Sequence, residues 1–209
     1  MKDGVLVVPT ANGVPSWSRE IYAVSAGHNF AVMTGTMTID EIVTVMQANH
    51  GAKVFHWCGH ATEEGLVVSR ETIWEASSLL PTLRAMGYDL VFLNTCSSEK
   101  LGNRIAFEAN VPVVIHGVGE ILDGEALAVA RNMYRQLRGL PRPGSLFEYY
   151  DAYVTARPDG GWVSIALGER FMSQFSPAPR RLSRLELHRT ILFVMAGLAL
   201  ALSLVGLLT

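Results

Sequence analysis

Three side chains with reactive chemistry alternate within one short stretch of the sequence. In KVFHWCGHATEEG, residues 53–65, every second position is taken by His56, Cys58 and His60. Successive side chains of an extended strand point to opposite faces, so a strand through this stretch would place all three on one side. Thiol and imidazole groups suit a metal site or nucleophilic catalysis. Burial as ordinary core residues is the third interpretation.

The second cysteine of the chain lies in another reactive stretch, VFLNTCSSE. An apolar run ends near Asn94, Cys96 follows, and a helical pattern begins near Ser98. A thiol between a strand end and a helix N-terminus gains from the helix dipole, which favours the nucleophilic thiolate. Such a thiol needs a base from a neighbouring strand end, and His60, which leaves its strand through Gly59, is the candidate.

A metal site would use the three alternating side chains as zinc ligands, with Cys96 as an optional fourth. Structural zinc sites usually pair their ligands through short loops, and no second CxxC or HxxxH set occurs elsewhere in the sequence. In metallopeptidases the HxxxH motif lies on a helix with glutamate after the first histidine, whereas Trp57 stands there in this chain. We therefore expect no metal and no cofactor, and interpret His56 and Cys58 as buried strand residues or as supports that orient His60.

Short apolar runs alternate with helical patterns along most of the chain. The predicted strands are residues 5–8, 30–33, 54–58, 66–68, 90–95 and 111–116. The predicted helices are residues 17–26, 39–49, 71–86, 99–109, 123–138 and 145–156. This alternation predicts an α/β fold whose central sheet is mostly parallel, with helices on both faces and short antiparallel additions such as LVVS and WVSIALG. Reactive groups of such sheets gather beyond the carboxyl ends of strands, where both reactive stretches lie.

The order of the motifs carries a family resemblance. A strand ends in a Gly–His pair, a later strand reads apolar-Asn-Thr-Cys-Ser, Val-Pro-Val-Val follows, and an acid-led helix contains Tyr near its end. The residues concerned are Gly59, His60, Asn94, Thr95, Cys96, Ser97, Val111 to Val114, Asp123, Tyr134 and Leu137. This order resembles the CHAT domain, one of the caspase-like, separase-related cysteine peptidases, over roughly residues 5–170. The resemblance implies a caspase-like fold.

The resemblance also implies a His–Cys dyad. Cys96 would attack the scissile carbonyl, and His60 would assist proton transfer to the leaving amine. Backbone amides near Ala61 and Cys96 would stabilise the oxyanion. The family usually has glycine after the histidine, and Ala61 can serve equally well if its backbone φ is not positive.

Two acidic residues are candidates for binding the substrate. In related peptidases an acid after the Val-Pro-Val-Val strand lines the pocket for the side chain that precedes the cut bond, which would favour a basic residue. Asp123 occupies this position, although negative charge in the first turn of a helix explains it equally well. Glu120 competes for the same role in the pocket.

The C-terminal part of the sequence predicts a membrane anchor. Residues 190–209, TILFVMAGLALALSLVGLLT, contain no charged residue and are long enough for one transmembrane helix. Residues 176–189 form a Pro- and Arg-rich juxtamembrane linker whose arginines the positive-inside rule keeps in the cytoplasm. These arginines are Arg180, Arg181, Arg184 and Arg189. We therefore expect a peptidase domain over residues 1–175 in the cytoplasm, held by a single-pass C-terminal anchor.

The composition of the 209 residues limits the class of partner. A net charge of −2 leaves no basic excess, so we expect no nucleic-acid partner. Two cysteines are too few for a disulfide scaffold, which favours a reducing compartment. Protein or peptide substrates and the membrane are the expected partners.

Three functional hypotheses remain open. The first is a membrane-anchored cysteine endopeptidase that hydrolyses peptide bonds of cytosolic proteins. The absence of a sensor module in the sequence favours activation by proximity or by a separate partner protein, and the resemblance implies a regulated effector in bacterial signalling or defence. The second is a catalytically silent caspase-like scaffold that binds a partner protein at the membrane. The third is a metal-dependent hydrolase.

Overall fold

The computed structural model describes residues 2–9, 15–137, 146–156 and 163–175. Contacts within the chain divide it into two compact units, Met1–Gln174 and Phe175–Thr209. The predicted linker and membrane span, residues 176–209, lie outside the described residues. Within the described ranges, no helix is long and apolar enough to cross a membrane.

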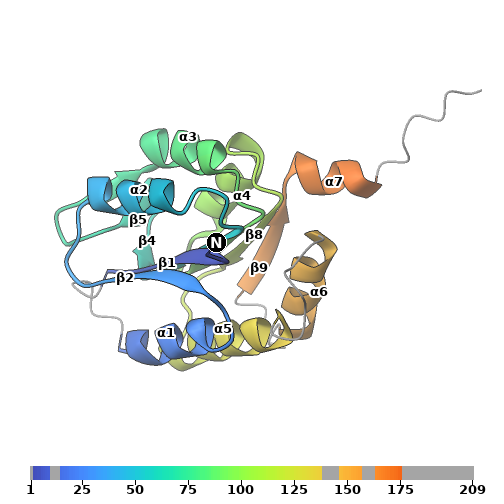
Figure 1. The fold of residues 1–209 in the computed structure, drawn as a ribbon, viewed down its shortest axis with the longest axis horizontal. Coiled ribbons are helices and arrows are strands. Elements are labelled where there is room, and N and C mark those ends of the chain that lie inside the picture. The colour runs from blue at the N-terminus through green and yellow to red at the C-terminus, as the bar shows by residue number, and fades with distance from the viewer. Residues whose placement is uncertain (1, 10–14, 138–145, 157–162, 176–209) are drawn as a thin grey trace, which may run out of the picture. The chain divides into compact units, whose positions relative to one another are not determined.

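A six-stranded sheet forms the centre of the first unit. Its strands, in spatial order, are β2 (Phe30–Thr34), β1 (Gly4–Val8), β3 (Val54–Cys58), β7 (Leu90–Asn94), β8 (Val113–Gly117) and β9 (Val163–Leu167). Every pairing is parallel except that of β8 with β9 (Figure 1). All residues of β1, β3, β7 and β8 are buried, as strands covered on both faces must be. The predicted α/β fold with a mostly parallel sheet is confirmed.

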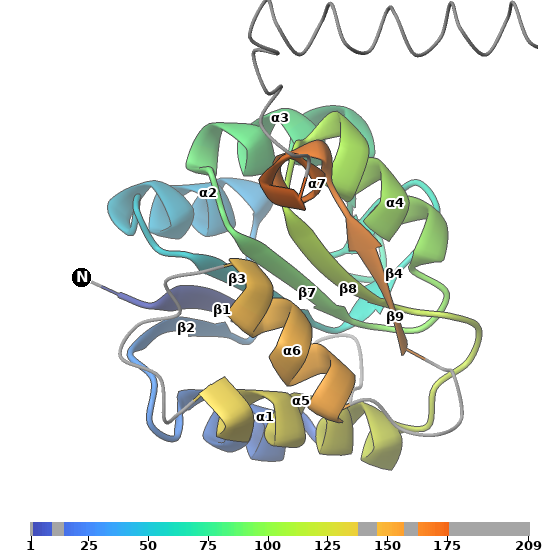
Figure 2. The same ribbon diagram turned by 90° about the vertical axis from the view of Figure 1, so that its right-hand side faces the viewer.

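Helices cover both faces of this sheet (Figure 2). One face carries α2 (Ile39–Ala48), α3 (Ala76–Met86) and α4 (Glu99–Glu108). The other carries α1 (Trp17–Ser25), α5 (Asp123–Leu137) and α6 (Leu146–Ala156). The alternation of side chains along each strand gives two cores: Phe55 and Trp57 of β3 pack under α2 to α4, and Cys58 faces α1, α5 and α6. Phe171 of α7 (Glu169–Phe175) joins the second core.

A small antiparallel sheet accounts for the main departure from the predicted elements. It consists of β4 (His60–Ala61), β5 (Gly65–Val67) and β6 (Ile73–Glu75). The prediction of a helix over 71–86 was wrong for its first turn, because Trp74 pairs with Leu66 in this sheet and is buried in the first core. The remaining predicted strands and helices occur in the structure with shifts of one or two residues at their ends.

The parallel pairing of β3 with β7 fixes the place of both reactive motifs. Cys58 and Asn94, the last residues of the two strands, are register partners. His60 and Cys96 each follow two positions later along the chain. Both therefore leave the sheet at the same edge, beyond the carboxyl ends of neighbouring strands.

A capping box begins α2 and provides a test of the fold. The backbone N–H of Glu41 donates to Thr38 Oγ1 at 3.3 Å, and the backbone N–H of Thr38 donates to Glu41 Oε2 at 2.7 Å. Thr38→Ala removes the acceptor for an otherwise unpaired helix N–H, and we expect it to lower the free energy of unfolding by about 1 kcal/mol. Urea unfolding followed by tryptophan fluorescence measures this change.

The matched control is Thr44→Ala, which changes another exposed threonine of the same helix. The Thr44 hydroxyl donates to the Asp40 carbonyl within the helix and serves no cap. We expect a change of less than about 0.5 kcal/mol, because alanine has the higher helix propensity. Equal losses in the two variants would contradict the capping role of Thr38.

Candidate active site

A pocket of about 120 Å³ lies beyond the carboxyl ends of β3 and β7. Three of the residues predicted for the site, His60, Cys96 and Asp123, line this pocket. Glu20 of α1 and Asn94 of β7 line it as well. Side chains from motifs far apart in the sequence thus meet at one concave surface.

The Cys96 side chain is half-buried and contacts the loop before α5. The backbone N–H of Ile121 donates to Cys96 Sγ at 3.3 Å, and the thiol lies 3.6 Å from the Ile121 carbonyl oxygen. An N–H group directed at sulfur is accepted more strongly by a thiolate than by a thiol. Cys96 Sγ therefore has both a hydrogen-bond donor and an acceptor of Ile121 within reach.

The turn after Cys96 is held by β8 and by the loop that follows it. Ser97 adopts a positive φ of 47°, a conformation that costs energy in a non-glycine residue. The Ser97 and Ser98 backbone N–H groups donate to the carbonyls of Gly119 and Gly117, at 2.8 and 3.1 Å. A Cβ at Gly117 would lie 2.1 Å from the Thr95 carbonyl oxygen, so only glycine allows this approach. The turn that presents the thiol is thus fixed by its neighbours.

His60 lies at the exposed rim of the pocket, at the start of β4. The indole N–H of Trp57 donates to the His60 carbonyl at 3.2 Å and ties this turn to β3. Among the described residues, the non-glycine residues with positive φ are Ser97 and Asn110. Ala61 therefore has an ordinary backbone conformation, and alanine in place of the glycine usual in CHAT domains introduces no strain.

The two acids predicted for substrate binding lie in different places. Asp123 is the first residue of α5, lines the pocket, and accepts a hydrogen bond from Ser16 Oγ at 2.8 Å. Both interpretations of Asp123, as a pocket acid and as an acid in the first turn of a helix, agree with this position. Glu120 is exposed in the loop before α5 and is not among the described residues that line the pocket.

The opening triplet of His56, Cys58 and His60 divides between two environments. His56 and Cys58 are 0% and 1% exposed and face the core under α1 and α5, which confirms their predicted burial. His60 lies beyond the end of the strand, exposed at the rim of the pocket, whose buried floor includes Cys58. Within the described residues, no group of three His, Cys, Asp or Glu side chains could hold a metal ion.

A buried polar network that the sequence analysis missed lies beside the pocket. Glu20 is 1% exposed, and its Oε1 accepts hydrogen bonds from His56 Nε2 and Asn94 Nδ2, both at 2.6 Å. His56 Nδ1 lies 2.9 Å from the Tyr134 hydroxyl oxygen. The sequence contained one sign of this network: Glu20 lies on the same helical face as the apolar residues Ala23 and Val24, where a carboxylate is rare.

Burial determines the protonation of this network. Burial and the Glu20 carboxylate raise the pKa of Tyr134 well above its ordinary value, so the phenol keeps its proton beside His56 Nδ1. Burial and the same carboxylate also raise the pKa of the Cys58 thiol far above its ordinary value, which makes Cys58 a poor nucleophile.

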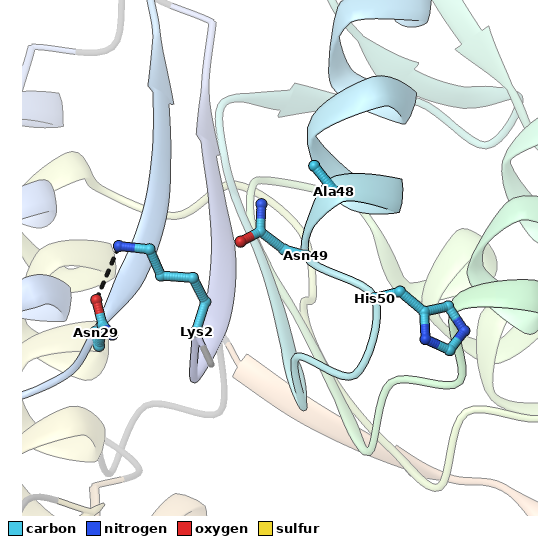
Figure 3. A pocket seen from close by; sticks show the side chains of 5 residues that line it. All are labelled: Lys2, Asn29, Ala48, Asn49 and His50. Carbon is cyan, nitrogen blue, oxygen red and sulfur yellow. Dashed lines mark hydrogen bonds between the residues drawn. The ribbon is translucent and has the colours of Figure 1, made fainter.

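A second pocket, of about 210 Å³, lies at the opposite edge of the sheet (Figure 3). It is lined by Lys2, Asn29, Ala48, Asn49 and His50. Lys2 Nζ donates to Asn29 Oδ1 at 2.8 Å, and the His50 ring points away from this pair (Figure 3). These residues precede β1, β2 and β3, so the pocket lies at the amino ends of parallel strands, away from the carboxyl ends where ligands of such sheets generally bind.

No family model matches the sequence, and the curated proteins include no match. Among solved structures, the chain is similar to an inactive zymogen of a C11 protease from Parabacteroides distasonis, with 13% identity and a TM-score of 0.47. The match covers 81% of this chain and 63% of that one, so the chain spans less than two thirds of the length of that protease. A likeness this distant carries no argument about function. The functional argument therefore rests on the residues of the pocket.

The two cysteines are expected to differ in reactivity. Cys96 is half-buried at the pocket, whereas Cys58 is buried and has a raised pKa. We expect iodoacetamide to label Cys96 at least about tenfold faster than Cys58 in the folded chain, because only an accessible thiolate reacts. Mass spectrometry of the tryptic peptides measures both rates, and Cys96→Ser is the control that should remove the fast phase. Equal labelling of the two residues would contradict the described pocket.

Proposed function

We propose that this protein is a cysteine endopeptidase of the CHAT type, in which Cys96 is the nucleophile and His60 the general acid and base. One observation supports this proposal most strongly: the His and Cys of two separate motifs line the same pocket. The ordinary backbone of Ala61 and the N–H group directed at Cys96 Sγ agree with it. The predicted substrates are cytosolic proteins.

In the proposed reaction His60 takes the proton of the Cys96 thiol, and the sulfur attacks the carbonyl carbon of the scissile peptide bond. A C–S bond forms while the carbonyl oxygen takes up negative charge, which backbone N–H groups near Ala61 and Cys96 would stabilise. The C–N bond then breaks, and His60 gives its proton to the leaving amine. Water, deprotonated by His60, hydrolyses the thioester to a carboxylic acid and restores the thiol.

The proposed enzyme is held at the membrane by residues 190–209, with its catalytic domain in the cytoplasm. A tether of this kind concentrates enzyme and substrate in a thin layer without new contacts between them. Activation by clustering or by a partner protein fits the surroundings of Cys96, since both the N–H and the carbonyl of Ile121 contact its sulfur. A partner that shifts the loop before α5 would change these contacts.

The dyad is tested by two substitutions in the full chain. Cys96→Ala should abolish peptide cleavage, because no other group can form the thioester. His60→Ala should lower kcat/KM by about 10²- to 10⁴-fold, the usual contribution of a general acid and base. The measurement is cleavage of a peptide library, with the fold checked by circular dichroism.

The matched control is His50→Ala, which removes an exposed histidine at the opposite edge of the sheet and should leave cleavage unchanged. Undiminished cleavage by Cys96→Ala would refute the dyad. Absence of cleavage together with inertness toward a thiol-directed probe would favour the scaffold hypothesis. Stoichiometric zinc in the purified chain, with activity lost on its removal, would favour the metal-dependent hydrolase.

The proposed anchor is tested by fractionation of cells that produce the full chain or a chain ending at residue 175. The twenty residues 190–209 carry no charge, so we expect the full chain in the membrane fraction even after alkaline carbonate extraction. The shortened chain should appear in the soluble fraction. Release of the full chain into the supernatant by alkaline carbonate would contradict the transmembrane anchor.

A further inference from the structure

We propose that the outer edge of β2, with the groove beside it, is a docking site for an extended basic segment of a partner protein. The segment would pair with β2 as an additional strand of the sheet and would bring lysine or arginine side chains to the acids of α2. This inference goes beyond the proposed function, because the site is separate from the pocket of Cys96. In the sheet, β1 lies between β2 and the strand β3 that leads to His60.

The first argument is the free edge of the sheet. Among the described strands, β2 is the last on its side and pairs with β1 alone, between the layers that hold α2 and α1 (Figures 1 and 2). The Gly35 backbone N–H donates to the Val8 carbonyl at 3.3 Å, so the peptide groups of alternate residues before it also face β1. Those of Val32 and Thr34 lie between them and point away from the sheet. Both residues are exposed, so a further strand can reach these donors and acceptors.

The second argument is the composition of this edge. The strand reads Phe-Ala-Val-Met-Thr and contains neither a charged residue nor a proline. It pairs with β1 in unbroken register from Phe30 to Thr34, and Val32 is 41% exposed. Edge strands are usually protected from other chains by a lysine, a proline or a bulge. An apolar edge without these features is a template for pairing with another strand.

The third argument is the groove beside the edge, which has a volume of about 620 Å³ and lies between β2 and α2. Its charged residues are Asp40 and Glu41, and the described residues that line it include no lysine or arginine. Hydrogen bonds from the Thr38 backbone N–H and hydroxyl lower the pKa of Glu41, so this carboxyl is ionised at neutral pH. The groove is therefore acidic and complements a cationic occupant.

The alternation of side chains along a strand specifies the occupant further. Met33 packs against the first core on the side of α2, whereas its neighbour Val32 points to the other face. An added strand would likewise place alternate residues over the groove and beside Val32. A lysine or arginine over the groove can cover Met33 and Met37 with its apolar stem and bring its charge to Asp40. A β-branched residue suits the position beside Val32, so the expected segment alternates basic and β-branched residues.

A second copy of this chain fits the same edge less well. Two β2 strands paired antiparallel about a twofold axis would form one continuous sheet, with both α2 helices on the same face. Asp40 and Glu41 of the two copies would then lie on one side of the interface, where like charges repel. The acids of the groove therefore favour a basic partner over self-association.

The test uses a blocked peptide of four Arg-Val repeats and the full chain carrying Cys96→Ala, so that no cleavage step enters the measurement. Fluorescence anisotropy gives the Kd, and hydrogen exchange of the Val32 and Thr34 backbone amides should slow at least about tenfold at saturation. A peptide of four Glu-Val repeats is the charge control and should bind at least about tenfold more weakly. Equal binding of the two peptides, or protection that spares β2, would overturn the proposal whatever the outcome of the cleavage assay.

Methylation of the peptide backbone separates strand pairing from attraction between charges. One Arg-Val peptide is methylated on the backbone nitrogens of its arginines, and another on those of its valines. The N–H groups of alternate residues point to opposite edges of a strand, so only one of the two sets can face β2. We expect one methylated peptide to bind at least about tenfold more weakly and the other to match the unmodified peptide. Equal affinity of the two methylated peptides would overturn the proposal.

Two pairs of variants locate the site on the protein. Val32→Pro removes an outward N–H without touching the ladder to β1 and should weaken binding at least about tenfold, whereas Val32→Thr keeps this N–H and should change the Kd by no more than about twofold. Asp40→Asn should weaken binding roughly three- to fivefold, and Asp151→Asn, exposed on α6, should leave it unchanged.

If Val32→Pro fails to fold, Asp40→Asn and the methylated peptides still decide. Undiminished binding by a folded Val32→Pro chain would overturn the proposal. A dimer of the full chain that Val32→Pro dissociates, measured by analytical ultracentrifugation, would overturn it in favour of a second copy.

Discussion

The parallel register between β3 and β7 is the constraint on which the candidate site depends. Cys58 stands opposite Asn94, so the two chains leave the sheet side by side, about 5 Å apart, with His60 and Cys96 two residues further on. A slip of one residue would turn every side chain of β3 to the other face. His56 would then lose Glu20 and Tyr134, and Phe55 and Trp57 would leave their core. The pairing that brings thiol and imidazole to one pocket is thus maintained by the packing of both cores.

The hydrogen bonds of the buried network also depend on the register between β3 and β7. Glu20, from α1, accepts from His56 of β3 and from Asn94 of β7, and Tyr134 of α5 completes the set. Burial of a carboxylate is costly unless its hydrogen bonds are made, so this arrangement is specific to one relative placement of two strands and two helices. The network therefore orients Asn94, the last residue of the strand that leads to Cys96, beside the pocket.

The sequence was sufficient for the parts of the fold that local patterns determine. Continuous apolar runs predicted β1, β3, β7 and β8, and helical spacing predicted α1, α2, α4 and α5, because burial on both faces or on one face leaves a periodic signature. The meeting of His60 and Cys96 at one pocket followed from strand ends, while their catalytic roles stay predictions. β6 was missed because its pairing with β5 outweighs the local helical pattern. The part played by Glu20 was missed because it depends on partners from three other elements.

One short loop contacts Cys96 and also leads into the wall of the pocket. Ile121 contacts Cys96 Sγ through both its N–H and its carbonyl. The Gly119 carbonyl accepts a hydrogen bond from the Ser97 N–H. Two residues after Ile121, Asp123 begins α5 and lines the pocket. The N–H groups of the strained turn after Cys96 thus donate to carbonyls of the segment that leads to Asp123. Any displacement of this loop changes the surroundings of the sulfur and the wall of the pocket together.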